Sequence, residues 1–217
     1  MSAPNVEDIY PLSPAQHSML IYLVLSGKGT RSEFYFDQLV ATFGDLDPER
    51  LRRAWQKVHD RHAALRTLFL ASNRERALQV VRKAIEVPWR QEDWRELPAD
   101  EREQRFSTFL VDDYAEGFDI EKAPLSRIAL IRFGDAEWKF VWSFSHLVLD
   151  GWSMAIVLGE MAEIYNAERD GREENLPEVR PYREFVAWLE QQDATPAENY
   201  WRTALAGFEP PTPLPFD

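Results

Sequence analysis

An alternating run of aromatic residues most constrains what this chain can fold into. Residues 138–146 read WKFVWSFSH, and the strand-like stretch RIALIRF precedes them across the short connection GDAE. Because successive side chains of a β-strand point to opposite faces of a sheet, the pattern predicts a hairpin with one strongly aromatic face. That face comprises Trp138, Phe140, Trp142, Phe144 and His146, whereas Val141, Ser143 and Ser145 point the other way.

Helical signals lie on both sides of this hairpin. Ser13, Pro14 and Gln16 fit an S-x-x-Q capping box with proline at the first helical position, which predicts a helix over 14–25. Asp47 and Pro48 begin another helix in the same manner. Apolar periodicity predicts further helices over 99–115, 153–168 and 181–192, and strand-like stretches cover 33–43, 64–70 and 77–89.

The composition excludes several classes of function. With 37 acidic and 25 basic residues, the chain has a net charge of −12, which disfavours binding to nucleic acid or to anionic membranes. It contains no cysteine, so disulfides, thiolate metal sites and cysteine nucleophiles are excluded. No apolar run approaches the roughly 20 residues that span a bilayer, and the start MSAPNVEDIY does not resemble a signal peptide. We therefore expect a cytoplasmic protein.

His146 is the residue whose position raises a functional question. A histidine on an aromatic strand face is usually a core residue with its hydrogen bonds satisfied. However, the face ends at His146, Asp150 and Gly151 form a tight turn in which glycine permits a close backbone approach, and a helix begins at once. A catalytic base at such a turn has rigid support on both sides. Spacing alone leaves both interpretations open.

Other candidate sites are weaker. His59 and His62 lie three residues apart on a predicted helix, but no third metal ligand is evident, so we interpret them as helix-end residues and expect no metal site. A serine nucleophile is poorly supported, because Ser145 points away from the neighbouring histidine and the chain has no G-x-S-x-G elbow. Arg66 is more typical of a structural charge than of a substrate clamp.

The stretch SHLVLDGWS resembles the His-His-x-x-x-Asp-Gly signature of condensation domains of nonribosomal peptide synthetases. YPLSPAQHSML, DRHAALRTLF, YREFVAWLEQQD and YWRTALAG resemble other motifs of that family, in the expected order across essentially the whole chain. The family is related in fold to chloramphenicol acetyltransferase. The resemblance therefore implies an α+β fold: a chloramphenicol acetyltransferase-like lobe with a mixed β-sheet flanked by helices.

The same resemblance implies roles for the residues of the signature. His146 matches the second histidine of the motif, which is the one implicated in chemistry, as a base or as the residue that positions the amine. Asp150 and Gly151 complete the signature, and backbone N–H groups around Gly151 could favour negative charge on the reacting carbonyl oxygen. Ser145 replaces the first histidine, and we interpret it, with Trp152, as supporting the site.

We expect Asp150 to act as a strut rather than as an acid. A partly buried carboxylate in a tight turn needs a partner, and the planar fork of an arginine can bind both of its oxygens. Arg66 is the first candidate for this pairing and Arg127 the second. The alternative is an exposed Asp150 that caps the following helix.

Family domains are about twice as long as this chain and consist of two similar lobes. We therefore expect residues 1–207 to form the N-terminal lobe, and the proline-rich residues 208–217 to be a linker toward a missing C-terminal lobe. Without that lobe, and without neighbouring synthetase domains, the fragment should be inactive.

The activity that the resemblance implies is amide-bond formation. The amine of one carrier-bound aminoacyl group attacks an acyl or peptidyl thioester on another carrier. Donor and acceptor peptidyl carrier proteins are the expected partners; their phosphopantetheine arms carry the substrates, so no directly bound cofactor is expected. The altered Ser145 leaves open a catalytically impaired module that docks carrier proteins, and an epimerisation domain would use the same histidine.

Overall fold

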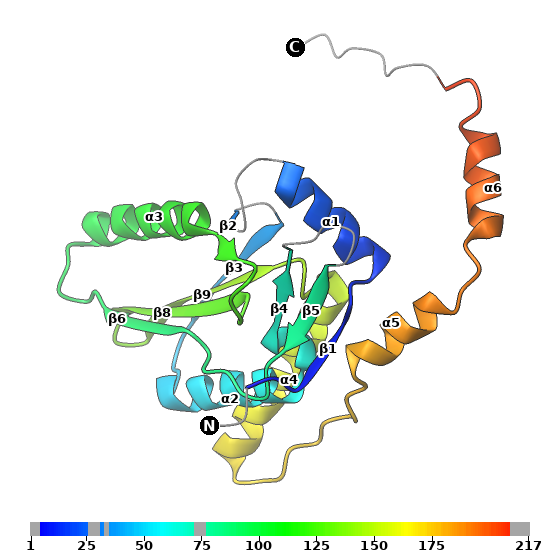
Figure 1. The fold of residues 1–217 in the computed structure, drawn as a ribbon. Helices are drawn as coiled ribbons and strands as arrows, with labels where there is room; N and C mark the ends of the chain where they lie inside the picture. The colour runs from blue at the N-terminus through cyan, green and yellow to red at the C-terminus, as the bar shows by residue number, and fades with distance from the viewer. Residues whose placement is uncertain (1–4, 26–30, 33–34, 72–76, 209–217) are drawn as a thin grey trace.

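The computed structural model describes residues 5–25, 31–32, 35–71 and 77–208 (Figure 1). Most of the predicted linker, residues 209–217, lies outside the described residues. The elements in chain order are β1 (Asp8–Pro11), α1 (Pro14–Leu25), β2 (Arg31–Ser32), β3 (Phe36–Phe43), α2 (Pro48–Arg61), the 3-10 helix η1 (Ala63–Arg66), β4 (Thr67–Leu70), β5 (Leu78–Val81), β6 (Trp89–Asp93), α3 (Ala99–Glu116), β7 (Phe118–Asp119), β8 (Ser126–Gly134), β9 (Glu137–Ser145), α4 (Gly151–Asp170), α5 (Tyr182–Glu190) and α6 (Thr195–Ala204).

The predicted hairpin forms the centre of a four-stranded sheet with the order β3-β9-β8-β6. β9 pairs antiparallel with β3 and β8, whereas β6 runs parallel to β8. A smaller antiparallel sheet has the order β1-β5-β4, and β2 pairs with β7. The expected α+β fold with a mixed β-sheet flanked by helices is confirmed.

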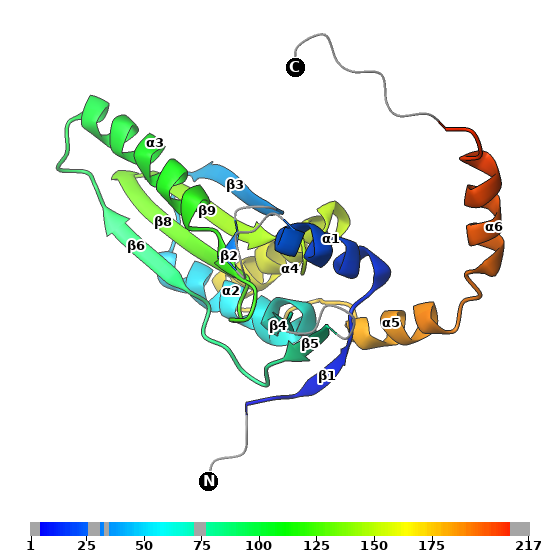
Figure 2. The ribbon, with the colours of Figure 1, turned by 45° about the horizontal axis from the view of Figure 1, so that its top comes forward.

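The two faces of β9 are covered by different helices. The aromatic face packs against α2 and α4, where the rings of Trp142 and Trp55 lie 4.8 Å apart and both side chains are fully buried. The opposite face, with Val141, packs against Phe106 and Phe109 of α3. Figure 2 shows α3 on one side of the sheet, with α2 and α4 on the other. Each large aromatic side chain buried here stabilises the fold by roughly 1.5–3 kcal/mol, and the predicted parity of the strand is confirmed.

The last two helices extend away from the body of the molecule (Figures 1 and 2). α5 contacts it through Val186, which packs with Tyr10 and Val81. In α6 none of the residues is buried, and Trp201 is 57% exposed. Among the described residues, no helix has both the length and the apolar character needed to cross a membrane.

Candidate functional site

His146 lies directly after β9, at the end of the aromatic face. Its backbone N–H donates to the Tyr35 carbonyl at 2.7 Å, which extends the β3–β9 ladder by one bond. Its ring Nδ1 lies 3.0 Å from the Leu149 carbonyl oxygen. Because a carbonyl only accepts hydrogen bonds, Nδ1 carries a proton. The side chain of His146 is 33% exposed, whereas the aromatic side chains that precede it on this face are buried, so the face reaches solvent at His146.

The other ring nitrogen of His146 faces a carboxylate. Nε2 lies 2.7 Å from Oδ2 of Asp37 on β3. In the strand register Asp37 is opposite Phe144, so Asp37 and His146 are diagonal neighbours on one face, within reach of each other's side chains. With acceptors at both nitrogens, the arrangement fits an imidazolium.

Sequence reasoning missed Asp37. The available signal was strand parity, because Asp37 alternates in phase with Leu39, Ala41 and Phe43, which pack against the main core. To predict a contact between Asp37 and His146 from this parity, one would also have to know that β3 pairs with β9 in this register.

Asp150 is the N-cap of α4. Its Oδ1 accepts a hydrogen bond from the Ser153 N–H at 2.7 Å, and the residue is exposed. Hydrogen bonds from the Ser153 backbone and hydroxyl hold the pKa of the Asp150 carboxyl below its usual value. The strut hypothesis is therefore wrong, because the helix terminus satisfies this carboxylate without an arginine.

Gly151 is the first residue of α4 and is not among the positive-φ glycines of the described chain. A Cβ atom built on it would meet no atom of the described residues within 4 Å. The described residues therefore show no close backbone approach to this glycine.

Arg66 is buried, but it does not reach Asp150. Its Nε donates to the His59 carbonyl at 3.1 Å, and its Nη1 lies 2.6 Å from Oε2 of Glu7 and also contacts the Arg82 carbonyl. Arg66 ends η1 directly before β4, so its guanidinium is held at the small sheet, beside the chain that leads into β1. The predicted pairing of Arg66 with Asp150 is wrong.

Arg127, the second candidate partner, lies on the α3 side of the main sheet. Its Nε is 2.6 Å from Oδ1 of buried Asp113, which also accepts from the Ser143 hydroxyl at 2.6 Å. Its guanidinium carbon lies 4.6 Å from the centre of the Phe118 ring. Arg127 therefore fixes α3 to the sheet, and its predicted contact with Asp150 is also wrong.

Ser145 and Trp152 occupy contrasting environments. Ser145 is buried on the opposite face from His146, as strand parity predicts; its N–H donates to the Leu125 carbonyl and its hydroxyl accepts from the Leu147 N–H at 3.3 Å. Trp152 is 84% exposed on the first turn of α4. Ser145 thus contacts the loop that follows His146, whereas Trp152 is presented to solvent.

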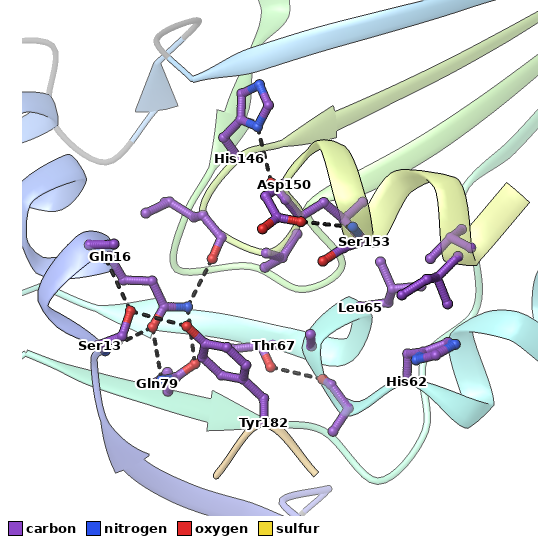
Figure 3. Close-up of a pocket in the computed structure, with 18 of the residues that line it drawn as sticks. Ser13, Gln16, His62, Leu65, Thr67, Gln79, His146, Asp150, Ser153 and Tyr182 are labelled. Atoms are coloured by element: carbon purple, nitrogen blue, oxygen red, sulfur yellow. Dashed lines mark hydrogen bonds between the residues drawn. The ribbon is translucent and has the colours of Figure 1, made fainter. Parts of the chain in front are cut away.

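A pocket with a volume of about 320 Å³ lies beside the loop 146–150 (Figure 3). The start of α1, the segment 62–65, the start of α4 and residues 179–182 form its other walls. The amide of Gln16 donates to the Leu147 carbonyl at 2.9 Å and lies 3.4 Å from the Gln79 side-chain oxygen. Figure 3 shows the imidazole of His146 turned away from this amide cluster.

The predicted capping box holds the Gln16 side chain in place. Ser13 N–H donates to the Gln16 side-chain oxygen at 3.0 Å, and Gln16 N–H donates to the Ser13 hydroxyl at 3.3 Å. The capping box is confirmed, and one of its members also binds the loop after His146.

His59 and His62 have separate surroundings. His59 is buried, with Nδ1 2.9 Å from the Trp55 carbonyl, and burial lowers the pKa of its imidazole to about 4.

His62 lines the pocket and places Nε2 2.8 Å from Oε2 of Glu160, which also contacts Arg61. Burial raises the pKa of the Glu160 carboxyl, but hydrogen bonds from Arg61 and His62 outweigh it and hold that pKa below its usual value. Across the described ranges, no group of three or more histidine, cysteine, aspartate or glutamate side chains is placed to hold a metal ion.

Comparisons with known proteins identify the family to which this chain is similar. The family model described as the condensation domain matches residues 6–217. One of the linear gramicidin synthase subunits of Brevibacillus parabrevis is 40% identical over 217 residues, which are 100% of this chain and 3% of that protein. Surfactin synthase subunit 3 of Bacillus subtilis (strain 168) is 32% identical over 209 residues, 96% of this chain and 16% of that protein. The chain thus spans a small part of these relatives.

Two solved structures share the fold. The EpoB cyclization-docking bidomain from Sorangium cellulosum superposes with a TM-score of 0.81 at 26% identity, covering 95% of this chain and 41% of that one. The starter condensation domain of rhizomide synthetase RzmA gives a TM-score of 0.79 at 20% identity, covering 94% of this chain and 50% of that one. With the family match over almost its whole length, this chain belongs to the condensation-domain family of nonribosomal peptide synthetases.

Proposed function

We propose that this chain supplies the histidine-bearing lobe of a condensation domain that forms an amide bond, with His146 as the proton acceptor. The observation that carries the proposal is the hydrogen bond from His146 Nδ1 to the Leu149 carbonyl. It fixes the ring and its tautomer, so that Nε2 is the nitrogen that exchanges protons. The ring is partly exposed and borders the pocket, where a substrate can approach it.

The chemistry requires little more than positioning and proton transfer. An amine attacks a thioester carbonyl, a C–N bond forms, the C–S bond breaks, and the thiolate leaves with a proton. Holding both reactants on carriers supplies effective molarities that reach about 10⁵–10⁸ M in well-oriented systems. A base that takes one amine proton typically adds about 10²–10⁴-fold.

The partners in this proposal are donor and acceptor carrier proteins, whose phosphopantetheine arms present the acyl and aminoacyl groups. The chain covers 41–50% of the two solved chains described above, which supports residues 1–207 as one lobe that completes its site against a second. No directly bound cofactor enters the reaction.

The test is reconstitution of the complete synthetase module with loaded donor and acceptor carriers. Amide product on the acceptor carrier is the expected result. Inversion of an aminoacyl Cα without a new amide would instead identify an epimerase. Carrier binding without any turnover would identify a docking module.

The 217-residue chain alone should fold but not catalyse. Its sheets and helices form an extensive buried core, but in this proposal the reaction also needs the opposite wall of the site. Turnover measured on the purified chain, together with light scattering for its mass, checks this. Condensation by the monomeric chain would contradict the two-lobe site.

A further inference from the structure

The Nε2 atom of His146 is occupied in this structure. Nδ1 is committed to the Leu149 carbonyl, and Asp37 Oδ2 lies 2.7 Å from Nε2. An imidazole nitrogen has a single in-plane direction for a hydrogen bond. An amine that gives a proton to Nε2 must therefore take the place that the Asp37 carboxylate now holds.

Asp37 can give up that place. It lies on β3, the edge strand of the main sheet, and its side chain is 56% exposed. The backbone at this corner is fixed, because the Tyr35 carbonyl accepts the His146 N–H. Tyr35 itself has φ 58°, a left-handed conformation that is rare outside glycine and often marks functional sites. A rotation of the carboxylate thus opens the direction toward Nε2 without moving either backbone.

The charges of Asp37 and His146 indicate which substrate group binds beside Nε2. Once His146 has given up its Nε2 proton, the exposed carboxylate beside its ring favours a cation that donates several hydrogen bonds, and a protonated α-amino group is such a group. We propose that Asp37 binds the α-ammonium group of the acceptor aminoacyl substrate, beside Nε2 of His146. This inference rests on the proposed function and adds a substrate-binding residue to it.

The protons balance through one cycle. At rest, the imidazolium is the cation partner of Asp37. When the ammonium enters, the imidazolium releases its Nε2 proton to solvent and the ammonium replaces it at the carboxylate. The ammonium then gives one proton to Nε2 as nitrogen attacks the thioester carbonyl. A second nitrogen-bound proton leaves with the thiolate, and the imidazolium–carboxylate pair is restored.

The first experiment uses a neutral nucleophile as a control for charge. In the reconstituted synthetase, amide formation is measured at varied concentrations of a free aminoacyl carrier, and ester formation with the matching hydroxyacyl carrier. Asp37→Asn preserves size but removes the charge. We expect it to lower kcat/KM for the aminoacyl carrier by roughly 10–150-fold, mainly through KM, because a charge-assisted hydrogen bond to the ammonium is lost. Any hydroxyacyl reaction should be unchanged. Asp45→Asn, in the exposed turn after β3, is the matched control and should behave as wild type.

The second experiment does not depend on turnover. The ring ¹H–¹⁵N signals of His146 are followed in the 217-residue chain as glycinamide or N-acetylglycinamide is added. Glycinamide, which carries the ammonium, should weaken the Nε2–H signal, whereas the neutral analogue should not, and Asp37→Asn should abolish the response. An equal response to both compounds, or a response that persists in Asp37→Asn, overturns the proposal.

The two proposals fail in different ways. Loss of turnover in His146→Ala with wild-type aminoacyl kinetics in Asp37→Asn would reject the role of Asp37 alone. Full turnover in His146→Ala would reject the proposed base, whatever Asp37 does.

Discussion

The side-chain amide of Gln16 donates a hydrogen bond to the carbonyl oxygen of Leu147, which lies 131 residues further along the chain. Gln16 is buried at the start of α1, and Leu147 directly follows His146. A member of the capping box of α1 therefore also fixes the loop that follows the histidine.

Gln16→Ala should destabilise the chain. The substitution leaves the buried Leu147 carbonyl and the Ser13 N–H without these partners, and a buried group left unsatisfied costs about 1–3 kcal/mol. Urea unfolding of the 217-residue chain measures the loss. Ser18→Ala, on the exposed side of the same helix, is the control and should stay within about 0.5 kcal/mol of wild type. Equal unfolding free energies for the two variants would contradict a role for the Gln16 bond.

Asp150 and Arg66 should behave as independent residues. Asp150→Ala removes a helix cap and should cost about 0.5–2 kcal/mol, while Asp150→Asn should cost little because asparagine caps equally well. Arg66→Ala should cost more, because it strips hydrogen bonds from a buried corner. Chemical denaturation of the two alanine variants and of their combination should give additive losses. A strongly non-additive double variant would indicate coupling that the structure does not contain.

His59 should make stability depend on pH. Burial lowers the pKa of its imidazole to about 4, whereas an unfolded chain gives about 6.5. Between these values the unfolded state binds more protons, so the free energy of unfolding should fall as pH drops from about 6.5 toward 4. The two pKa values differ by about 2.5 units, so the loss is on the order of 3 kcal/mol.

His59→Gln keeps an amide that can donate to the Trp55 carbonyl but does not titrate in this range. Subtracting its urea-unfolding profile from that of wild type isolates the contribution of His59. A flat difference between pH 6.5 and 4 would show that His59 titrates normally in the folded chain.

The elements around His146 were predictable because their signals are local. The alternation over 138–146 determined which side chains of β9 share a face, and Ser13 with Gln16 marked the start of α1. These patterns depend on residues close together in the chain, where backbone geometry dictates which side chains meet.

The partners of the charged residues were not predictable in the same way. Arg66 pairs with Glu7, Arg127 with Asp113 and His146 with Asp37, and each pairing depends on which strands or segments become neighbours. Motif positions identified Arg66 and Arg127 as charges to be satisfied, but several carboxylates could satisfy each of them. The order of the strands determines which carboxylate each basic residue pairs with, and the sequence pattern does not specify that order.

The most direct test of the central claim compares the adjacent residues Ser145 and His146 at the end of β9. In the reconstituted synthetase, His146→Ala should reduce the rate of amide formation by about 10²–10⁴-fold, the usual contribution of a positioned base. Ser145→Ala should have a much smaller effect, because its hydroxyl contacts the Leu147 N–H and not the reacting groups. Comparable losses in both variants, or full activity in His146→Ala, would contradict the assignment of His146 as the working residue of this site.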